Sequence, residues 1–400
     1  MAWTPTDETQ FDTAYLSGLS DFELATLFNT SPDRVDHYLR SRKKSENPLP
    51  KRGTFIPKEV KASLEVTSNN FDALLLSRLK KTKEAIPITL LCDEFDCSPK
   101  RIVEAISRLQ IDHALVNIVN GAALVSAPEV GGVKLLHGVD EYLNGENLVF
   151  GVVSDQHMGS KFARDDINEA LYDIFEEEGI NMVFNCGNWI EGEASFNKNE
   201  LTVHGMNNQV HHFAKNYPKR TGITTYFIAG DDHEGWYVKR EGIDIGKYAE
   251  MVARDEYKRD DLVYLGYMEH DVKFPTSEGQ VTIRVMHPGG GSAYAISYQP
   301  QKIVESFTPG DKPNILLVGH YHKQLAMFLR GIHVVSVGCT QVQSSFMRKN
   351  RLSAALGGYI VRAKLAPDGS VLRFMPEFLS FYDSAPNWEY PMLNQKILDM

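Results

Sequence analysis

The sequence predicts an α/β protein in which two layered sheets are flanked by helices, with smaller and mainly helical units in front of them. Two observations lead to this fold class. After residue 145 short β-branched runs alternate with helical stretches, whereas before it short helices are joined by basic and polar connections. In addition, a chain of 400 residues is too long for one small domain and suits two or three.

The composition is that of an ordinary globular protein, with 42% hydrophobic and 24% charged residues. No apolar run approaches the roughly 18–20 residues that span a bilayer, and the polar N-terminus lacks the apolar core of a signal peptide. The four cysteines show no metal-knuckle spacing. We therefore expect a cytoplasmic protein with reduced thiols and no membrane partner. The net charge of −10 argues against coating nucleic acid through bulk charge, but it is compatible with local basic patches.

Residues 1–46 have the pattern of a helix-turn-helix unit. Ser20 and Asp21 can cap a helix over residues 22–28, and Pro32 suits the first position of a second helix that continues to residue 42. This pair resembles small DNA-binding units in its length and in the placement of its apolar residues. A helical hairpin that serves only for packing fits the same pattern, and the segment alone does not choose between the two.

A basic stretch follows this unit and runs into a linker over residues 47–70, where Pro48 and Pro50 break any helix. A solvated connector is the simplest interpretation of such a charge run. After a helix-turn-helix unit, an arm that contacts phosphates is the alternative. Its candidate DNA-binding residues are Arg40, Arg42, Lys43 and Lys44.

Residues 71–130 predict a winged-helix unit, in which three helices are followed by two short strands around residues 120–121. Pro87 stands near the start of the second helix, and Ser98 caps the third. The third helix is the candidate recognition helix, with Lys100, Arg101 and Arg108 as further candidate DNA-binding residues. Two consecutive units of this kind favour contact with DNA, although winged helices also serve as protein-docking modules.

From residue 145 to residue 385 strands and helices alternate, and a tail over residues 386–400 follows. The predicted strands cover residues 148–153, 182–186, 225–229, 272–274, 281–286, 315–318, 325–329, 334–337, 357–364 and 371–378, with helices at 165–178 and 207–217. Polar residues of unusual type stand directly after five of these strands. Positions just beyond strand ends are where layered α/β proteins carry their sites.

Four of the five polar segments contain carboxylates or imidazoles, and the second contains Asn188. They are Ser154-Asp155-Gln156-His157, Cys186-Gly187-Asn188-Trp189, Gly230-Asp231-Asp232-His233-Glu234, His287 and Gly319-His320-Tyr321-His322. A carboxylate and an imidazole two residues apart at a strand end point to the same side, which suits one divalent ion. Each segment alone also fits an ordinary polar turn, but all five in this order indicate a metal site.

This series of motifs resembles that of the calcineurin-like metallophosphoesterases, and the resemblance covers about residues 147–376. It implies two sets of metal ligands: Asp155, His157 and His322 for one ion, and Asp232, His287 and His320 for the other. In the third motif either Asp231 or Asp232 takes the place of the family's asparagine. We favour Asp232 because it immediately precedes the histidine, as the motif requires.

The resemblance also implies two catalytic positions. His233 matches the family's catalytic histidine, which faces the phosphate, and we expect Glu234 to orient its imidazole. Asn188 falls where the family has the aspartate that bridges both metal ions. A neutral amide cannot bridge two cations as a carboxylate does, so we expect this form of the chain to be a silenced variant, engineered rather than natural. A natural site with one strong and one weak metal is the alternative.

With an aspartate at position 188, the resemblance implies two-metal hydrolysis of a phosphoester. Two ions about 3.5–4 Å apart generate a hydroxide and clamp the phosphate oxygens during in-line attack. His233 then stabilises the transition state or protonates the leaving oxygen. Manganese is the first expectation for a mixed histidine and carboxylate set, with iron, zinc and nickel as alternatives.

The family includes protein phosphatases, nucleotide phosphodiesterases and DNA nucleases, so the fold alone does not choose a substrate. The two N-terminal units favour DNA, and the chemistry is similar to that of the double-strand-break-repair nuclease branch. In that branch the extra domains follow the phosphoesterase, whereas the order here is like that of phage or mobile-element proteins. Nucleases of the superfamily often form homodimers, and the sequence does not decide this for the present chain.

Two further interpretations of the function stay open. One is a phosphatase or phosphodiesterase of small nucleotides or phosphoproteins, and the other is a non-catalytic DNA-binding regulator with a degenerate site. Trp189, Trp236 and Tyr237 flank the second and third motifs, where they would stack unpaired bases or pack in the core. Several basic residues near the motifs are candidates for a phosphate track: Lys161, Arg164, Lys198, Lys239, Arg240, Arg348, Lys349 and Arg351.

Overall fold

The computed structural model describes residues 8–16, 24, 27–28, 30, 32–42, 68–136, 143–144, 147–291 and 293–381. Most of the basic linker, the C-terminal tail, the capping pair Ser20 and Asp21, and the candidate DNA-binding residues Lys43 and Lys44 lie outside these residues. The chain divides into two compact units, residues 1–73 and 74–400.

The first unit contains helices α1 (Glu8–Leu16) and α3 (Pro32–Arg42), and α3 begins at Pro32 as predicted. A small apolar core holds the unit together, with Phe11, Tyr15, Leu24, Val35, Tyr38 and Leu39 buried. The guanidinium of Arg42 donates to the Asp12 carboxylate at 2.7 Å and so ties the end of α3 to α1.

Three helices and a hairpin, the elements predicted for residues 71–130, span residues 68–125, and the first helix crosses the boundary between the two units. The elements are α4 (Ser68–Lys80), β1 (Ile86–Pro87), α5 (Ile88–Phe95), α6 (Pro99–Ile111), β2 (Val116–Val119) and β3 (Ala122–Val125). The strands form one antiparallel sheet in the order β1-β3-β2. The Ser98 side chain accepts from the backbone N–H of Arg101, so it caps α6 as predicted.

Two mixed sheets make up most of the second unit. The larger has the order β16-β15-β6-β7-β8-β9, with β5 (Leu143–Asn144) paired to β6 (Asn147–Val153); the others are β7 (Met182–Asn185), β8 (Thr224–Ala229), β9 (Leu262–Tyr267), β15 (Gly357–Leu365) and β16 (Val371–Ser380). The smaller has the order β13-β14-β12-β11-β10-β4, from β4 (Val133–Leu135), β10 (Glu269–Pro275), β11 (Gln280–Met286), β12 (Ile315–Val318), β13 (Leu325–Leu329) and β14 (Ile332–Ser336).

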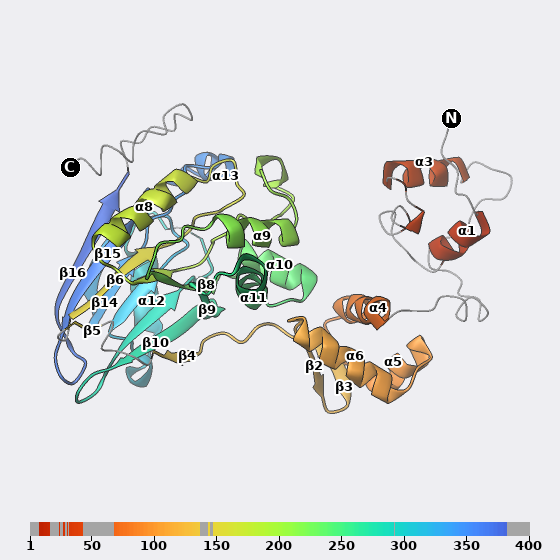
Figure 1. The fold of residues 1–400 in the computed structure, drawn as a ribbon, viewed down its shortest axis with the longest axis horizontal. Helices are drawn as coiled ribbons and strands as arrows, with labels where there is room; N and C mark the ends of the chain where they lie inside the picture. The colour runs from red at the N-terminus through yellow and green to blue at the C-terminus, as the bar shows by residue number, and fades with distance from the viewer. Residues whose placement is uncertain are drawn as a thin grey trace. The chain divides into compact units, whose positions relative to one another are not determined.

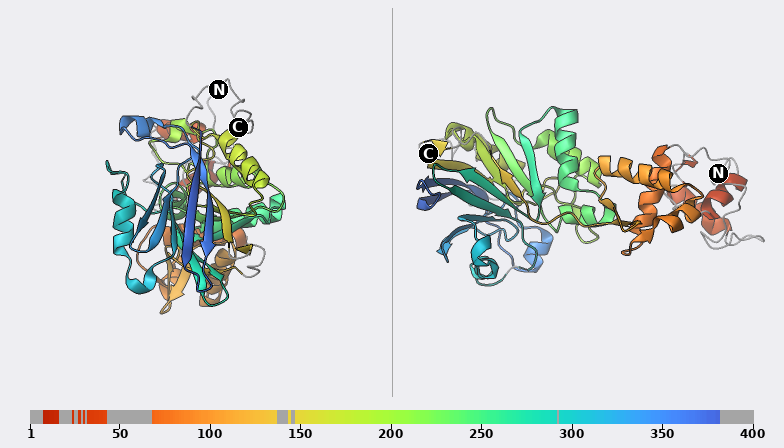
Figure 2. Two further views of the ribbon diagram at one scale, coloured as in Figure 1. Left: turned by 90° about the vertical axis from the view of Figure 1, so that its left-hand side faces the viewer. Right: turned by 90° about the horizontal axis from the view of Figure 1, so that it is seen from below.

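The two sheets pack face to face over an apolar core that draws on both, including Phe150, Phe184, Phe274 and Leu317. Helices α8 (Asp165–Glu177), α9 (Met206–Asn216) and α11 (Ile245–Tyr257) cover the outer face of the larger sheet. Helix α12 (Tyr298–Ser306) packs on the smaller sheet. The order of layers is therefore helix, sheet, sheet, helix, as Figures 1 and 2 show. The predicted α/β class with two layered sheets is the one observed.

The predicted strands agree with the observed ones to within a few residues, but the segment from residue 234 to residue 267 was not predicted. It forms helix α10 (Glu234–Glu241), α11 and strand β9. The α11 helix has a clear local cause, because the Asp244 carboxylate accepts from the backbone N–H of Lys247 at its first turn. Helix α10 matters for the site because His233 is its N-cap residue.

Candidate metal centre

All of the predicted metal ligands gather where parallel strands of the two sheets end. Strands β6, β7 and β8 run parallel in one sheet, and β11 and β12 run parallel in the other. Because the carboxyl ends of parallel strands meet at one edge, the five polar segments that follow them come together. His157, Asn188, Asp232, His233, His320 and His322 line one cavity of about 280 Å³, while Asp155 and His287 are fully buried.

The first cluster consists of Asp155, His157 and His322. The Asp155 Oδ1 atom lies 3.2 Å from His322 Nε2 and 3.8 Å from His157 Nε2. The two imidazole Nε2 atoms are 3.1 Å apart. Three donor atoms therefore converge on one point, in a geometry that could hold a metal ion.

The second cluster consists of Asp232, His287 and His320. The Asp232 Oδ1 atom lies 3.3 Å from His287 Nε2, and Asp232 Oδ2 lies 3.1 Å from His320 Nδ1. Among the described residues, Asp232 Oδ1, His287 Nε2 and His320 Nδ1 have no hydrogen-bond partner although they are buried. Buried donors and acceptors without partners are costly, so their convergence fits a cation that would satisfy all three.

Asn188 lies between the two clusters. Its Nδ2 donates to Asp155 Oδ1 at 3.3 Å, on the side of the first cluster. Its buried Oδ1 has no partner within the described part of the chain. Gly230 packs against this oxygen and against Asp232 and His287, since a Cβ there would lie 3.0 Å from Asn188 Oδ1 and from Asp232 Oδ1. The predicted bridging position is thus occupied by an amide whose nitrogen faces one carboxylate.

Three of the four histidine ligands have the ring nitrogen that points away from the cluster held by an acceptor. His157 Nδ1 lies 3.0 Å from the Glu191 carboxylate, His287 Nδ1 donates to the Cys186 carbonyl at 2.5 Å, and His320 Nε2 donates to the Gly290 carbonyl at 2.6 Å. An imidazole that donates from one nitrogen presents a lone pair at the other. Such outer contacts set the tautomer of metal-binding histidines. The donor set therefore fits a divalent metal ion at each cluster.

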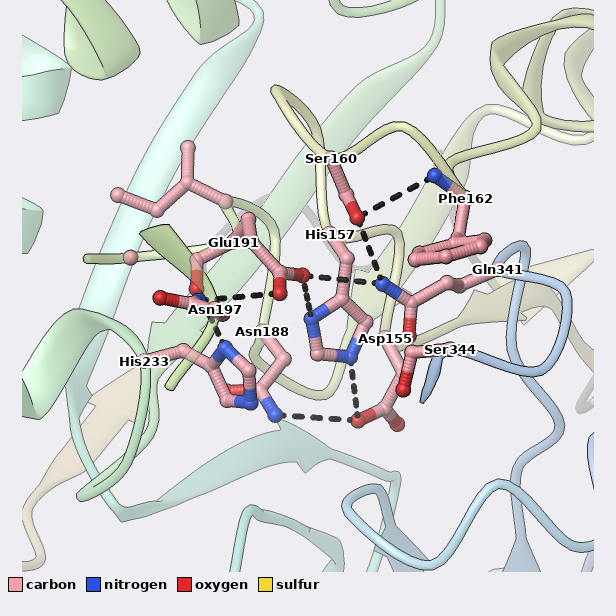
Figure 3. Close-up of polar contacts among 12 residues, drawn as sticks. Asp155, His157, Ser160, Phe162, Asn188, Glu191, Asn197, His233, Gln341 and Ser344 are labelled. Carbon is pink, nitrogen blue, oxygen red and sulfur yellow. Dashed lines mark hydrogen bonds and ion pairs between the residues drawn. The ribbon is translucent and has the colours of Figure 1, made fainter. Parts of the chain in front are cut away.

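Glu191 was not among the predicted site residues, yet it organises the first cluster (Figure 3). Its buried carboxylate contacts His157 Nδ1 and accepts from Gln341 Nε2 at 2.9 Å and from Asn197 Nδ2 at 3.1 Å. Its backbone carbonyl lies 2.5 Å from His233 Nδ1. One residue thus positions both a metal ligand and the candidate catalytic histidine. The sequence signal was only an acid three residues after Asn188, which is too common to interpret alone.

The histidine ligands of the two clusters differ in protonation. Burial and the neighbouring His233 lower the pKa of His157 to about 4, so this ligand is neutral at pH 7. Burial would lower the pKa of His287 as well, but the Asp232 carboxylate raises it to about 9. Burial would also raise the pKa of Glu191, but contact with His157 lowers it to about 2. In the first cluster burial would also lower the pKa of His322, but Cys339 and the Asp155 carboxylate raise it well above its usual value. Each cluster therefore contains one histidine that must release a proton to bind a cation, whereas His157 is already neutral.

The backbone of the site is held in an uncommon conformation. Asp155, His157, Asn188, His233, His320 and His322 all have φ between 41° and 77°. Side-chain-bearing residues adopt this left-handed region rarely, and such strain persists where the surrounding fold imposes it. Its concentration at these positions is independent support for a functional site.

His233 and its neighbours differ in part from the predictions. The prediction that Glu234 orients the His233 imidazole is wrong, because the buried Glu234 carboxylate accepts from the backbone N–H groups of Asn188, Ile190 and Gly230 at 3.2–3.3 Å. It therefore joins the two motif loops. Burial raises the pKa of Glu234 to about 8. Asp231 accepts from the Tyr267 hydroxyl at 2.7 Å, away from the cluster, which agrees with the choice of Asp232 as ligand.

The flanking aromatic residues divide between core and cavity. Trp189 and Tyr237 are fully buried, and Trp189 packs against Phe213 and Phe227, so stacking of bases on these two rings is excluded by their burial. Trp236 lines the cavity beside His233.

The candidate DNA-binding residues have varied surroundings. Arg40 is exposed and pairs with Asp36, whereas Arg42 is engaged by Asp12 within its own unit. Lys100 and Arg101 are exposed on α6, and Arg108 is partly buried there. Lys100, Arg101 and Arg108 do not line the cavity of the metal clusters. Their contact with DNA stays a prediction.

Comparison with known proteins leaves the family open. No family model matches the chain, and no curated protein matches it. Among solved structures it is similar to an archaeal phosphodiesterase, with 12% identity, 58% of this chain and 100% of that chain covered, and a TM-score of 0.30. Vacuolar protein sorting 29 from Cryptosporidium parvum has 14% identity, coverage of 58% and 97%, and a TM-score of 0.28. A predicted phosphoesterase from Streptococcus pneumoniae has 13% identity, coverage of 58% and 98%, and a TM-score of 0.27.

With TM-scores this far below 0.5, these likenesses establish neither a family nor a function for the chain. The case for a metal centre therefore comes from the residues of the two clusters and their geometry alone. A search of the described helices finds none that is both long and apolar enough to cross a membrane.

Proposed function

We propose that this chain is a metal-dependent phosphoesterase that uses two divalent cations, with manganese as the first candidate. One observation carries the proposal: two His/Asp clusters with converging donor atoms flank Asn188 and share a cavity with His233. When bound, two such ions supply a hydroxide at neutral pH and offset the charge on the phosphate oxygens. The motif resemblance to calcineurin-like metallophosphoesterases supports phosphoesters as the substrate class.

The remaining steps fall to the protein's own side chains. His233 donates from Nδ1 to the Glu191 carbonyl, which leaves its Nε2 as the atom that exchanges a proton with the leaving oxygen. Glu234 joins the second and third motif loops through backbone N–H groups and so keeps Asn188 and His233 in register. The strained backbone at the ligands keeps their side chains aimed at the clusters before substrate binds.

Asn188 is expected to limit this form of the chain. An amide brings no negative charge to the position between the clusters, and its nitrogen faces the Asp155 carboxylate. A carboxylate there would attract both cations, by about 4 kcal/mol for a unit charge at 4 Å in a partly polar environment. The chain as given therefore holds the second ion weakly and turns over slowly.

The finer proposal is that the phosphodiester belongs to DNA. It is supported by the helix–turn–helix geometry of α5 and α6 and by the exposed Lys100 and Arg101 on α6. A phosphatase or phosphodiesterase of small nucleotides or phosphoproteins is the enzymatic alternative. A DNA-binding regulator without activity is the third, and the complete set of histidine and aspartate ligands apart from position 188 speaks against it.

The test compares the chain as given with Asn188→Asp, in manganese, on labelled single- and double-stranded DNA and on a small phosphodiester. We expect Asn188→Asp to gain at least about a hundredfold in hydrolysis and to lose it with a chelator. The double variant Asn188→Asp/His157→Ala is the matched inactive control. Hydrolysis of the small ester alone would replace the nuclease proposal by the small-substrate one. No gain on any phosphoester would overturn the phosphoesterase itself.

A further inference from the structure

Three aromatic side chains form a continuous wall along the cavity of the metal clusters. Phe196 precedes the short helix η2 (Lys198–Glu200), Trp236 lies on α10, and Phe346 lies on α13 (Ser345–Lys349). All three line the same cavity as the metal ligands. We call these three residues the aromatic wall. Its members are far apart in the chain, so only the fold brings them together.

The wall begins beside the first cluster and extends away from it. The His157 and His233 rings have centroids 4.4 Å apart, and the Trp236 ring follows 4.4 Å from His233 at an interplanar angle of 32°. The Phe196 ring lies 5.5 Å from Trp236, and the Phe346 ring lies 5.9 Å from Phe196. A path of rings thus leads from a metal ligand to the outer part of the cavity.

The two outer rings of the aromatic wall, Phe196 and Phe346, are exposed, whereas two aromatic side chains within or next to the metal-site motifs are buried. Phe196 is 60% exposed and Phe346 is 53% exposed, whereas Trp189 and Tyr237 are fully buried. Adjacent exposed aromatic rings leave apolar area in water, and rings grouped beside a polar site are typical of ligand binding. The exposed rings of the aromatic wall are therefore available to stack on a planar group that enters the cavity.

Basic side chains accompany the two exposed rings. Lys198 stands two residues after Phe196, and Arg348 and Lys349 follow Phe346 on α13. All three side chains are exposed, and none takes part in an ion pair within the described residues. A cationic rim around aromatic faces is the combination that binds unpaired nucleic acid, since the rings stack on bases and the cations meet phosphates.

We propose that the aromatic wall is a base-binding subsite, which stacks an unpaired nucleobase while the phosphate of the same nucleotide lies at the metal clusters. The position of the phosphate rests on the proposed function. In a nucleotide the sugar separates the base from the phosphate, and the exposed rings are likewise set back from the clusters by His233 and Trp236. An aryl phosphate such as phosphotyrosine lacks this spacer, because its ring is bonded directly to a phosphate oxygen, so it is the comparison ligand for an aromatic ring held close to the phosphate.

The test measures binding and does not require turnover. Thymidine 5′-monophosphate, deoxyribose 5-phosphate and phosphotyrosine are titrated into the full chain in manganese, and the affinities are compared by calorimetry. We expect the thymidine nucleotide to bind about tenfold tighter than the sugar phosphate, because stacking on an aromatic ring favours the base. Equal affinities would overturn the subsite, and so would tighter binding of phosphotyrosine.

Variants separate stacking from general apolar contact. Phe196→Leu and Phe346→Leu keep an apolar side chain but remove the planar face, so each is expected to lower the preference for the nucleotide severalfold. Phe346→Tyr keeps the face and the preference. Phe328→Leu changes a similarly exposed ring on β13 outside the cavity and is the matched control. The proposal would be contradicted if Phe196→Leu and Phe346→Leu both kept the preference for the thymidine nucleotide over the sugar phosphate, with the melting temperature unchanged.

The outcome stays distinguishable from that of the proposed function. If Asn188→Asp hydrolyses a phosphoester but the chain shows no preference for the base, only the proposal of the subsite is wrong. If the chain prefers the base but Asn188→Asp hydrolyses no phosphoester, only the proposal of the phosphoesterase is wrong. Binding of oligothymidylate, as a single strand and as a duplex, shows whether the bound base belongs to a DNA strand or to a free nucleotide. Tighter binding of the single strand than of the mononucleotide or the duplex would indicate a DNA strand, and equal binding of strand and mononucleotide would indicate a free nucleotide.

Discussion

The two metal clusters have the same ligand types but differ in how firmly they are held. In the first, the side chains of Asp155, His157 and His322 are 0%, 2% and 11% exposed. In the second His287 is fully buried, but Asp232 is 29% and His320 is 17% exposed. Asp155 Oδ2 accepts from the Ser154 hydroxyl at 2.6 Å and from the His320 backbone N–H at 2.9 Å. The Glu191 carboxylate and its network fix His157 in the first cluster, while a backbone carbonyl stands behind each of the two imidazoles of the second cluster.

We infer from this difference that the two clusters will bind a cation with different affinities, although their ligand types are the same. A preorganised and buried set of ligands loses little freedom when it binds a cation, and its charges are poorly screened by water. We expect the more open cluster to need additional negative charge from position 188, which Asn188 does not supply. We therefore expect one tight and one weak divalent ion in the chain as given.

The largest effect is expected from removing one ligand of each cluster in turn. His157→Ala should weaken the tight manganese site by at least about a hundredfold, since it removes a ligand rather than a supporting contact. His320→Ala should leave that site nearly unchanged and abolish only the weak one. Calorimetric titration with manganese measures both. Equal losses in the two variants would break the comparison.

Asn188→Asp should convert the weak second site into a tight one, because it adds a unit of negative charge between the clusters. The stoichiometry of tight manganese binding should rise from one to two. Without metal the same carboxylate would stand beside Asp155, at the position where the amide nitrogen now lies 3.3 Å from it. The metal-free variant should therefore melt at a lower temperature than the parent and gain more on adding manganese, as followed by thermal denaturation.

Glu191→Gln should weaken the tight site by about 10–100-fold, the usual cost of losing a partner of a metal-binding histidine. The amide keeps the size of the side chain but no longer accepts from His157 as a carboxylate. Glu193→Gln is the control, since the Glu193 carboxylate accepts from the Gly205 backbone instead. An affinity that falls equally in both variants would point to a general charge effect and not to the positioning of His157.

Ser154→Ala should have the smallest effect on the metal. It removes the 2.6 Å hydrogen bond to Asp155, so the free energy of unfolding should fall by about 1–3 kcal/mol while manganese affinity changes less than about tenfold. Chemical denaturation and calorimetry measure the two quantities. Ser107→Ala on α6, whose hydroxyl donates to a carbonyl of its own helix, is the control. A larger change in metal affinity than that of Glu191→Gln would reverse the assigned roles.

Much of the fold could be predicted because its signals are local. Alternating and β-branched runs located most strands of both sheets, although not β4, β5 or β9, and the capping residue Ser98 located the start of α6. The segment from α10 to β9 was missed, although Asp244 and the apolar spacing of α11 are local signals of the same kind. The prediction for Glu234 failed for another reason, because its three partners lie in two loops that follow two different strands, β7 and β8.

By itself the sequence identified the candidate ligand set, since carboxylates and imidazoles at strand ends suit a divalent metal wherever the strands lie. It also showed that position 188 carries an amide. Only the tertiary structure decided that Asp232 and not Asp231 faces the cluster, that Glu191 holds His157, and that Phe196 and Phe346 join Trp236. The physical reason is distance along the chain: a ligand is recognisable by its own chemistry, whereas a supporting contact or a shared surface exists only once remote segments have packed together.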